Sequence, residues 1–336
     1  MKVQLVTTTI LLASACCSLG LGQAAARPSV LIIDIDNYVE YQTDIWDVSK
    51  FATNPNITLS TGYRNFGDAT LLGDIVAVNG QPAKGLYAAR SPHILTSQNP
   101  GNGRAIADTQ HNSIRTEVYE ILKSEGDLVG TIVVLGLPGV VVPPGSPSAQ
   151  TGWDLPIIGG SGAFFGVRGA AGKGDRPGAT TARLASVAED PGNRRLNGGA
   201  RDRRVLTIIP WSAPQIVTTA SGPAVVHSGD FTPVSTSKPA KAGEILSLVA
   251  TGLGPVKPGV DPGQPFPSDP LAVANSPIQV MINGQPAEVL GAVGYPGSVD
   301  AYQVNFRLPA DTKAGMATVQ VSAAWIAGPL VSIAVQ

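Results

Sequence analysis

Residues 113–122 carry the side chains best suited to chemistry in this chain. Alternate side chains of an extended strand share a face, so Arg115, Glu117 and Tyr119 lie together on one side of the segment. A charged pair and a phenol inside a barrel could orient a ligand or move a proton. The alternative, which we favour here, is that this face points to solvent, where charged residues usually lie.

Two further residues are candidates for lining a barrel cavity. Arg90 follows the apolar segment 84–89, and Trp153 ends the Pro/Gly/Ser-rich segment 138–153. A loop of that length is typically functional or disordered, and it could cover one mouth of a barrel with Trp153 against a ligand. The alternative is an exposed loop whose tryptophan packs on the rim.

No metal site is predicted. The three histidines lie in different segments without paired spacing, so we expect surface or turn positions for them: His93, His111 and His227. Asp34 and Asp36 begin like a calcium loop, but the required pattern breaks immediately after them. A solvated strand edge is the better interpretation of these carboxylates.

The glycine-rich stretch 159–169 predicts a strand, a tight turn and a second strand with an aromatic plug. It lacks the glycine spacing of a dinucleotide site, and the Gly172-Lys173 pair is followed by glycine where a phosphate-binding loop needs Ser or Thr. Ser161 lacks the glycine pattern of a nucleophile elbow, so we interpret it as a turn residue. No cofactor is therefore predicted.

Residues 159–169, read as GGSGAFFGVRG, resemble the motif G-G-[ST]-G-x-F-x-G-[AV]-x-G of allene oxide cyclase and dirigent-like barrels. The resemblance implies an eight-stranded antiparallel β-barrel with a mostly apolar cavity and few polar groups. Plant members of that group cyclise a fatty-acid-derived epoxide or guide the coupling of phenolic radicals. Outside this stretch no match places a catalytic carboxylate, so no catalytic residue is carried over.

Composition also indicates an all-β protein. Charged residues make up 14% of the chain, and 39 Gly with 28 Pro separate short Val/Ile/Leu-rich segments. An Asn-Gly pair in residues 79–83 predicts a hairpin, and the same five residues recur at 283–287. The net charge of -1 gives no reason to expect nucleic acid or an anionic membrane as partner. The arginine-rich segment 189–204 could bind a polyanion, but we favour a solvated hairpin or loop.

Residues 1–26 have the pattern of a cleaved signal peptide, with Lys2, a short apolar run and a small-residue exit before Arg27. The apolar run is too short to span a membrane, so we expect a secreted or periplasmic protein. Cys16 and Cys17 lie within this segment, which leaves the mature chain without a disulfide. Lipid attachment at Cys16 is the alternative that we do not favour.

The chain is expected to hold two domains. The first, residues 27–209, would be the barrel; residues 210–213, with flanking prolines, would be a linker. Residues 214–336 resemble the C-terminal Ig-like module of many secreted proteins of soil bacteria, notably the acidobacterial group, on segments 250–255, 302–309 and 319–321. That resemblance implies a β-sandwich, and six short strands at sandwich-like spacing agree with it.

We expect the barrel to bind one small apolar molecule, with the Ig-like module as a spacer or an attachment to an extracellular polymer or protein. The alternatives are a cyclase-like or dirigent-like enzyme and a structural or adhesive protein. Room for a ligand is inferred from small residues in the barrel strands: Gly73, Ala77, Gly85, Ala88, Ala89, Gly130 and Gly136. The oligomeric state is not predicted.

Overall fold

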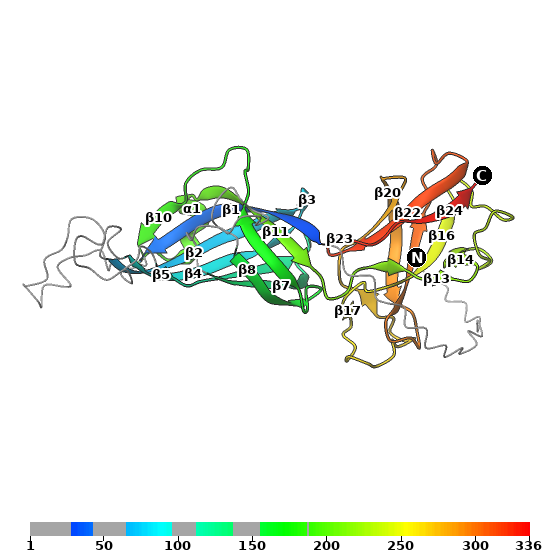
Figure 1. Cartoon of the computed structure of the whole chain (residues 1–336), viewed down its shortest axis with the longest axis horizontal. Coiled ribbons are helices and arrows are strands. Elements are labelled where there is room, and N and C mark those ends of the chain that lie inside the picture. Colours follow the sequence, from blue (N-terminus) through cyan, green and yellow to red (C-terminus); the bar gives the residue numbers. More distant parts are fainter. Residues whose placement is uncertain (1–27, 43–64, 96–111, 137–154, 187) are drawn as a thin grey trace, which may run out of the picture.

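The computed structural model describes residues 28–42, 65–95, 112–136, 155–186 and 188–336. It consists of β-strands, with a 3₁₀ turn η3 (Pro191–Asn193) and a one-turn helix α1 (Arg194–Asn197) as its helical elements in the described ranges. Two bodies of β-structure lie end to end along the long axis (Figure 1). The signal-peptide prediction and the 138–153 loop fall outside the described residues.

The first body is a closed eight-stranded antiparallel barrel, as predicted. Its strands are β1 (Ser29–Gln42), β2 (Asn65–Val78), β4 (Lys84–Leu95), β6 (Arg115–Leu122), β7 (Leu128–Gly136), β8 (Leu155–Gly162), β9 (Arg168–Lys173) and β11 (Ala200–Ile209). Each pairs with the next in this order. The barrel closes where β11 pairs with β1, opposite Ser29 at Ile208. This is an up-and-down connection, which leaves no open sheet edge.

Three short strands flank the barrel wall: β3 (Gln81–Pro82), β5 (Asn112–Ser113) and β10 (Arg183–Ser186). β10 runs parallel to the outer end of β1. The segment from β10 through η3 and α1 connects β9 to β11.

Both Asn-Gly turns form as predicted, and the asparagine of each turn also bonds to a strand outside its own hairpin. Asn79 and Asn283 have the positive φ of 50° that such turns require. The Asn79 side chain accepts from the Ile32 amide at 2.7 Å, while its backbone amide donates to the Ile32 carbonyl. Asn283 makes the same pair of bonds with Thr318. The repeated five residues thus form the same turn, with the same contact to a neighbouring strand, in both bodies.

A β-bulge in β1 changes which side chains enter the barrel. Leu31, Ile33 and Ile35 alternate inward, and the pairing register then shifts between Ile35 and Tyr38. Asn37 has a φ of 52° at this point. The extra residue turns Tyr38 to the interior, where it joins the barrel core.

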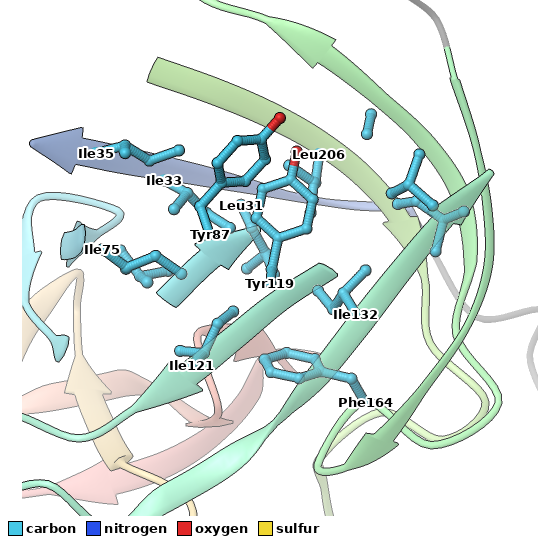
Figure 2. Close-up of a cluster of buried hydrophobic side chains, with 14 of the residues drawn as sticks. Leu31, Ile33, Ile35, Ile75, Tyr87, Tyr119, Ile121, Ile132, Phe164 and Leu206 are labelled. Carbon is cyan, nitrogen blue, oxygen red and sulfur yellow. The ribbon is translucent and has the colours of Figure 1, made fainter. Parts of the chain in front are cut away.

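The barrel interior is apolar at one end. Phe164, in the turn between β8 and β9, is 1% exposed and closes this end, which confirms the aromatic plug. Figure 2 shows the Phe164 ring beside Ile121, with Tyr87 and Tyr119 farther in and their hydroxyls directed away from it. Ser161 lies at the end of β8, where its hydroxyl bonds to Thr131 at 2.7 Å.

The second body is a nearly closed sheet with its own core. Its main strands, six as predicted, are β16 (Ile245–Thr251), β19 (Ile278–Ile282), β20 (Gln285–Gly294), β21 (Ala301–Arg307), β22 (Gly315–Ala323) and β24 (Val331–Val335). Its shorter strands are β12 (Gln215–Ile216), β15 (Val225–His227), β17 (Val256–Lys257), β18 (Val273–Ala274) and β23 (Ile326–Ala327), with β13 (Thr218–Thr219) and β14 (Gly222–Pro223) paired apart. No helix in the described ranges has the length and apolarity needed to cross a membrane.

The arginine-rich segment corrects an expectation. The sequence favours a solvated hairpin or loop for residues 189–204, but the barrel strand β11 begins at Ala200. Its outward arginine Arg203 pairs with Asp34 at 2.6 Å, and Arg201 lies 3.5 Å from Asp36. Asp34 and Asp36 are therefore ion-paired with a distant segment rather than only solvated, because β11 is the strand that closes against β1.

The two bodies meet at the apolar end of the barrel. Trp325 donates its indole N–H to the Gln81 side chain at 3.0 Å, and Lys257 lies 3.0 Å from Asp127. Ala324 and Ile326, from the second sheet, are buried within the barrel's own core cluster. The polar residues described next lie in the opposite half of the barrel.

Candidate functional site

A buried carboxylate, Glu117, forms the centre of a polar cluster inside the barrel. Tyr87 donates its hydroxyl to Oε1 at 2.9 Å, and Tyr119 donates to Oε2 at 2.6 Å. The Nε of Arg115 lies 2.7 Å from Oε1, and its Nη2 donates to the Tyr87 hydroxyl at 2.8 Å. These residues come from β4 and β6, where Tyr87 and Tyr119 stand directly opposite each other.

A second arginine, Arg204 on β11, covers the cluster from the other side of the barrel. Its guanidinium lies 5.2 Å from the Tyr87 ring centre and 5.8 Å from that of Tyr38. It donates to the Tyr38 hydroxyl at 3.2 Å and pairs with Asp202 at 2.9 Å. Lys173 lies 3.9 Å from Asp202. The cluster thus combines buried charges of both signs with three phenols.

The environment fixes the protonation of these groups. Burial acts to raise the pKa of Glu117, but Arg204, Arg115 and the tyrosine hydroxyls outweigh it and hold that pKa below its usual value. Burial raises the pKa of both Tyr87 and Tyr119 well above the usual range. At neutral pH the site therefore holds an ionised carboxylate and protonated phenols.

Of the five residues that the sequence suggests for lining a barrel cavity, the structure brings together three. Arg115, Glu117 and Tyr119 are 3%, 1% and 0% exposed, so the solvent-facing interpretation that we favoured is wrong. The alternation itself was correct; the strand belongs to a closed barrel, whose inner face receives this set. Arg90 is exposed, since its neighbour Ala89 takes the inward position on β4. Trp153 lies outside the described residues.

Sequence reasoning missed Tyr38, Tyr87 and Arg204. Alternation from Leu31 would place Tyr38 outside, and only the bulge turns it inward. Arg204 lies in the segment 189–204, for which the sequence favours a solvated hairpin or loop. For Tyr87 a signal existed, because the Asn-Gly turn sets the register of β4 and could have marked Tyr87 as inward-facing.

The small residues expected to leave space are mostly positions of close contact. A Cβ on Gly85 would lie 2.0 Å from the Glu120 carbonyl oxygen, and one on Gly130 would lie 2.3 Å from that of Ser161. At Gly73 the neighbouring Ile35 side chain already fills the position. These glycines permit tight strand packing in the barrel wall and are no sign of a cavity. The predicted apolar cavity stays a prediction.

Two hollows lie away from this cluster. One, of about 80 Å³, is at the junction of the two bodies between the β8–β9 turn and residues 252–254, and is large enough for only a few water molecules. The other, of about 180 Å³, is an open hollow lined by residues from 254–264 of the long proline-rich excursion, with Phe266 and Tyr302.

The described residues contain no group of His, Cys, Asp and Glu side chains that could hold a metal ion. His227 is buried rather than at the surface as expected, and its Nδ1 lies 2.7 Å from Glu244. The side chains of His93 and His111 are outside the described set.

Comparison of the chain with protein-family models, curated proteins and solved structures finds no significant match. The fold and the cluster therefore define the class: a closed up-and-down β-barrel with a buried layer of tyrosines and ion pairs. Chemically, such a layer can donate hydrogen bonds and stabilise charge of either sign.

Proposed function

We propose that the barrel binds one small, largely apolar molecule whose polar end is held by the cluster of Tyr38, Tyr87, Arg115, Glu117, Tyr119 and Arg204. The supporting observation is that this cluster is buried in a barrel otherwise lined with Ile, Leu, Val and Phe. Buried ion pairs are weak stabilisers, and apolar replacements are often as stable. A barrel needed only for its fold would have no use for two buried arginines, whereas a binding site would.

The protein is further proposed to be exported, with the second sheet as an Ig-like spacer or attachment module for an extracellular polymer or protein. The signal-peptide pattern of residues 1–26 and the sequence resemblance of residues 214–336 support this. N-terminal sequencing of material from the native host should find Arg27 first. Retention of Met1 or a lipid on Cys16 would contradict it.

The binding proposal is tested on exported protein by native mass spectrometry. Arg203 and Arg204 are adjacent on β11 but face opposite sides of the wall, so they form a matched pair. We expect one bound organic molecule in the wild type and in Arg203→Met, and a reduced amount in Arg204→Met. Circular dichroism establishes that both variants are folded. A wild-type protein that carries nothing, and takes up nothing from a lipid extract of the host culture, would contradict the proposal.

A second candidate is an enzyme of the cyclase or dirigent type, in line with the resemblance of residues 159–169. The observation that favours it is the ionised Glu117 beside Tyr119, a base and an acid 2.6 Å apart in a water-poor interior. An intramolecular rearrangement would need no cofactor. In that case the bound molecule should change retention time without changing mass during incubation with wild-type protein, and Glu117→Gln should abolish the change.

A further inference from the structure

The three clustered tyrosines differ in whether their hydroxyl group donates or accepts its hydrogen bond. Tyr87 and Tyr119 both give theirs to Glu117. The Tyr38 hydroxyl instead receives a hydrogen bond from Arg204 at 3.2 Å, and Arg115 acts on it as a second donor. Arginine has no acceptor atom, so neither neighbour can take the Tyr38 proton.

Within the described ranges, the hydrogen bond found at the Tyr38 hydroxyl is one that it accepts, and the nearby Asp202 carboxylate is paired with Arg204 at 2.9 Å. The residue is 7% exposed, and a buried hydroxyl with an unused donor is costly unless something accepts from it. Burial raises its pKa despite both arginines, so the proton stays on the oxygen at neutral pH.

The position of Tyr38 suits contact with a ligand. The bulge in β1 places it on the inner face opposite Ala200, and Ala89 and Ala171 contribute further small side chains to the same core. Its ring packs on Tyr87 with 5.9 Å between centroids. The direction of the hydroxyl is thus fixed by the Tyr87 ring and the Arg204 guanidinium.

We propose that Tyr38, supported by Arg204, is the hydrogen-bond donor to an acceptor oxygen of the bound molecule. This specifies the ligand class as a molecule with an apolar body and a carbonyl or ether oxygen, and it rests on the binding function proposed above. Two donor-only arginines around the phenol also polarise its O–H bond, so the same contact would stabilise negative charge on that oxygen.

The test uses two probes of similar shape, acetophenone labelled with ¹³C at its carbonyl and ethylbenzene, which lacks the oxygen. Full-length exported protein is compared with Tyr38→Phe, which removes only the hydroxyl. Tyr302→Phe is the control, because it removes a buried hydroxyl that bonds to the Gly254 carbonyl in the second sheet. Affinity is measured by calorimetry and the carbonyl stretch by isotope-edited infrared spectroscopy.

We expect Tyr38→Phe to bind acetophenone about 3-fold to 10-fold more weakly, the range of one neutral hydrogen bond. The carbonyl stretch should move to higher frequency as the bond is lost, while ethylbenzene affinity and the Tyr302→Phe results stay unchanged. If both probes bind and Tyr38→Phe alters neither reading, the donor role is wrong and the binding function stands. If the wild type binds neither probe, both proposals fail.

Discussion

At the residue scale, Glu117 is the group on which the buried cluster depends. Its carboxylate pairs with Arg115, attracts Arg204 together with Asp202, and accepts hydrogen bonds from Tyr87 and Tyr119. Removing one partner of a buried ion pair leaves the other charge uncompensated, which is the costly case.

Glu117→Gln is therefore expected to lower the free energy of unfolding by about 3–5 kcal/mol, measured by urea denaturation. The control is Glu288→Gln, which breaks an exposed pair with Arg307 and should change little. An equal loss of unfolding free energy in the two variants would show that the buried ion pair stabilises the fold no more than the exposed one.

The same residue predicts a pH dependence. Its folded pKa is depressed below the usual 4.5, so its stabilising contribution is complete above that pH and is lost as the pH falls through the folded pKa. Asp34 and Asp74 have pKa values shifted in the same direction by their arginine partners and add to this loss. Unfolding midpoints measured from pH 7 down to pH 2 should fall less steeply for Glu117→Gln than for wild type.

At the scale of elements, one carboxylate ties the helical part of the connection between β9 and β11 to the barrel wall, in addition to the pairing of β10 with β1. Asp74, on the outer face of β2, pairs with Arg194 and with Arg195 at 2.7 Å, and it accepts from Asn37 at 2.9 Å. The short helix α1 has no capping side chain, so its position depends on these contacts.

Asp74→Asn should release α1 from the barrel wall and speed trypsin cleavage after Arg194 and Arg195, as measured by mass spectrometry of the fragments. Asp230→Asn, which breaks an exposed pair with Lys238, should leave the cleavage rate at these sites unchanged. Unaltered cleavage in Asp74→Asn would mean that α1 is held by something other than the ion pairs.

The elements also show what sequence reasoning could reach. The hairpins, the glycine-rich turn and the alternation in β6 follow from local rules, and all are confirmed. Local rules do not reveal the bulge before Tyr38, since it depends on pairing with both β2 and β11. Nor do they reveal that Arg203 meets Asp34, residues brought together only by barrel closure.

At the scale of the whole molecule, the second sheet contributes to the barrel's core. Ile326 is 3% exposed and belongs to the cluster that includes Phe164.

Ile326→Ala should lower the free energy of unfolding by about 2–5 kcal/mol. Hydrogen exchange should quicken in β8 and β9 of the barrel, although the residue lies in β23. Met316→Ala, at a position 64% exposed, should leave exchange unchanged. Faster exchange confined to the second sheet would contradict the coupling.

The closure of the barrel through its first and last strands fixes where the chain enters it. Ser29 lies opposite Ile208, at the end that meets the second sheet, while the cluster around Glu117 lies in the other half. The route into β1 and the route out of β11 are therefore neighbours. An affinity tag or sensor-surface linker joined ahead of Ser29 would hold the molecule by this end and orient the tyrosine cluster toward the sample.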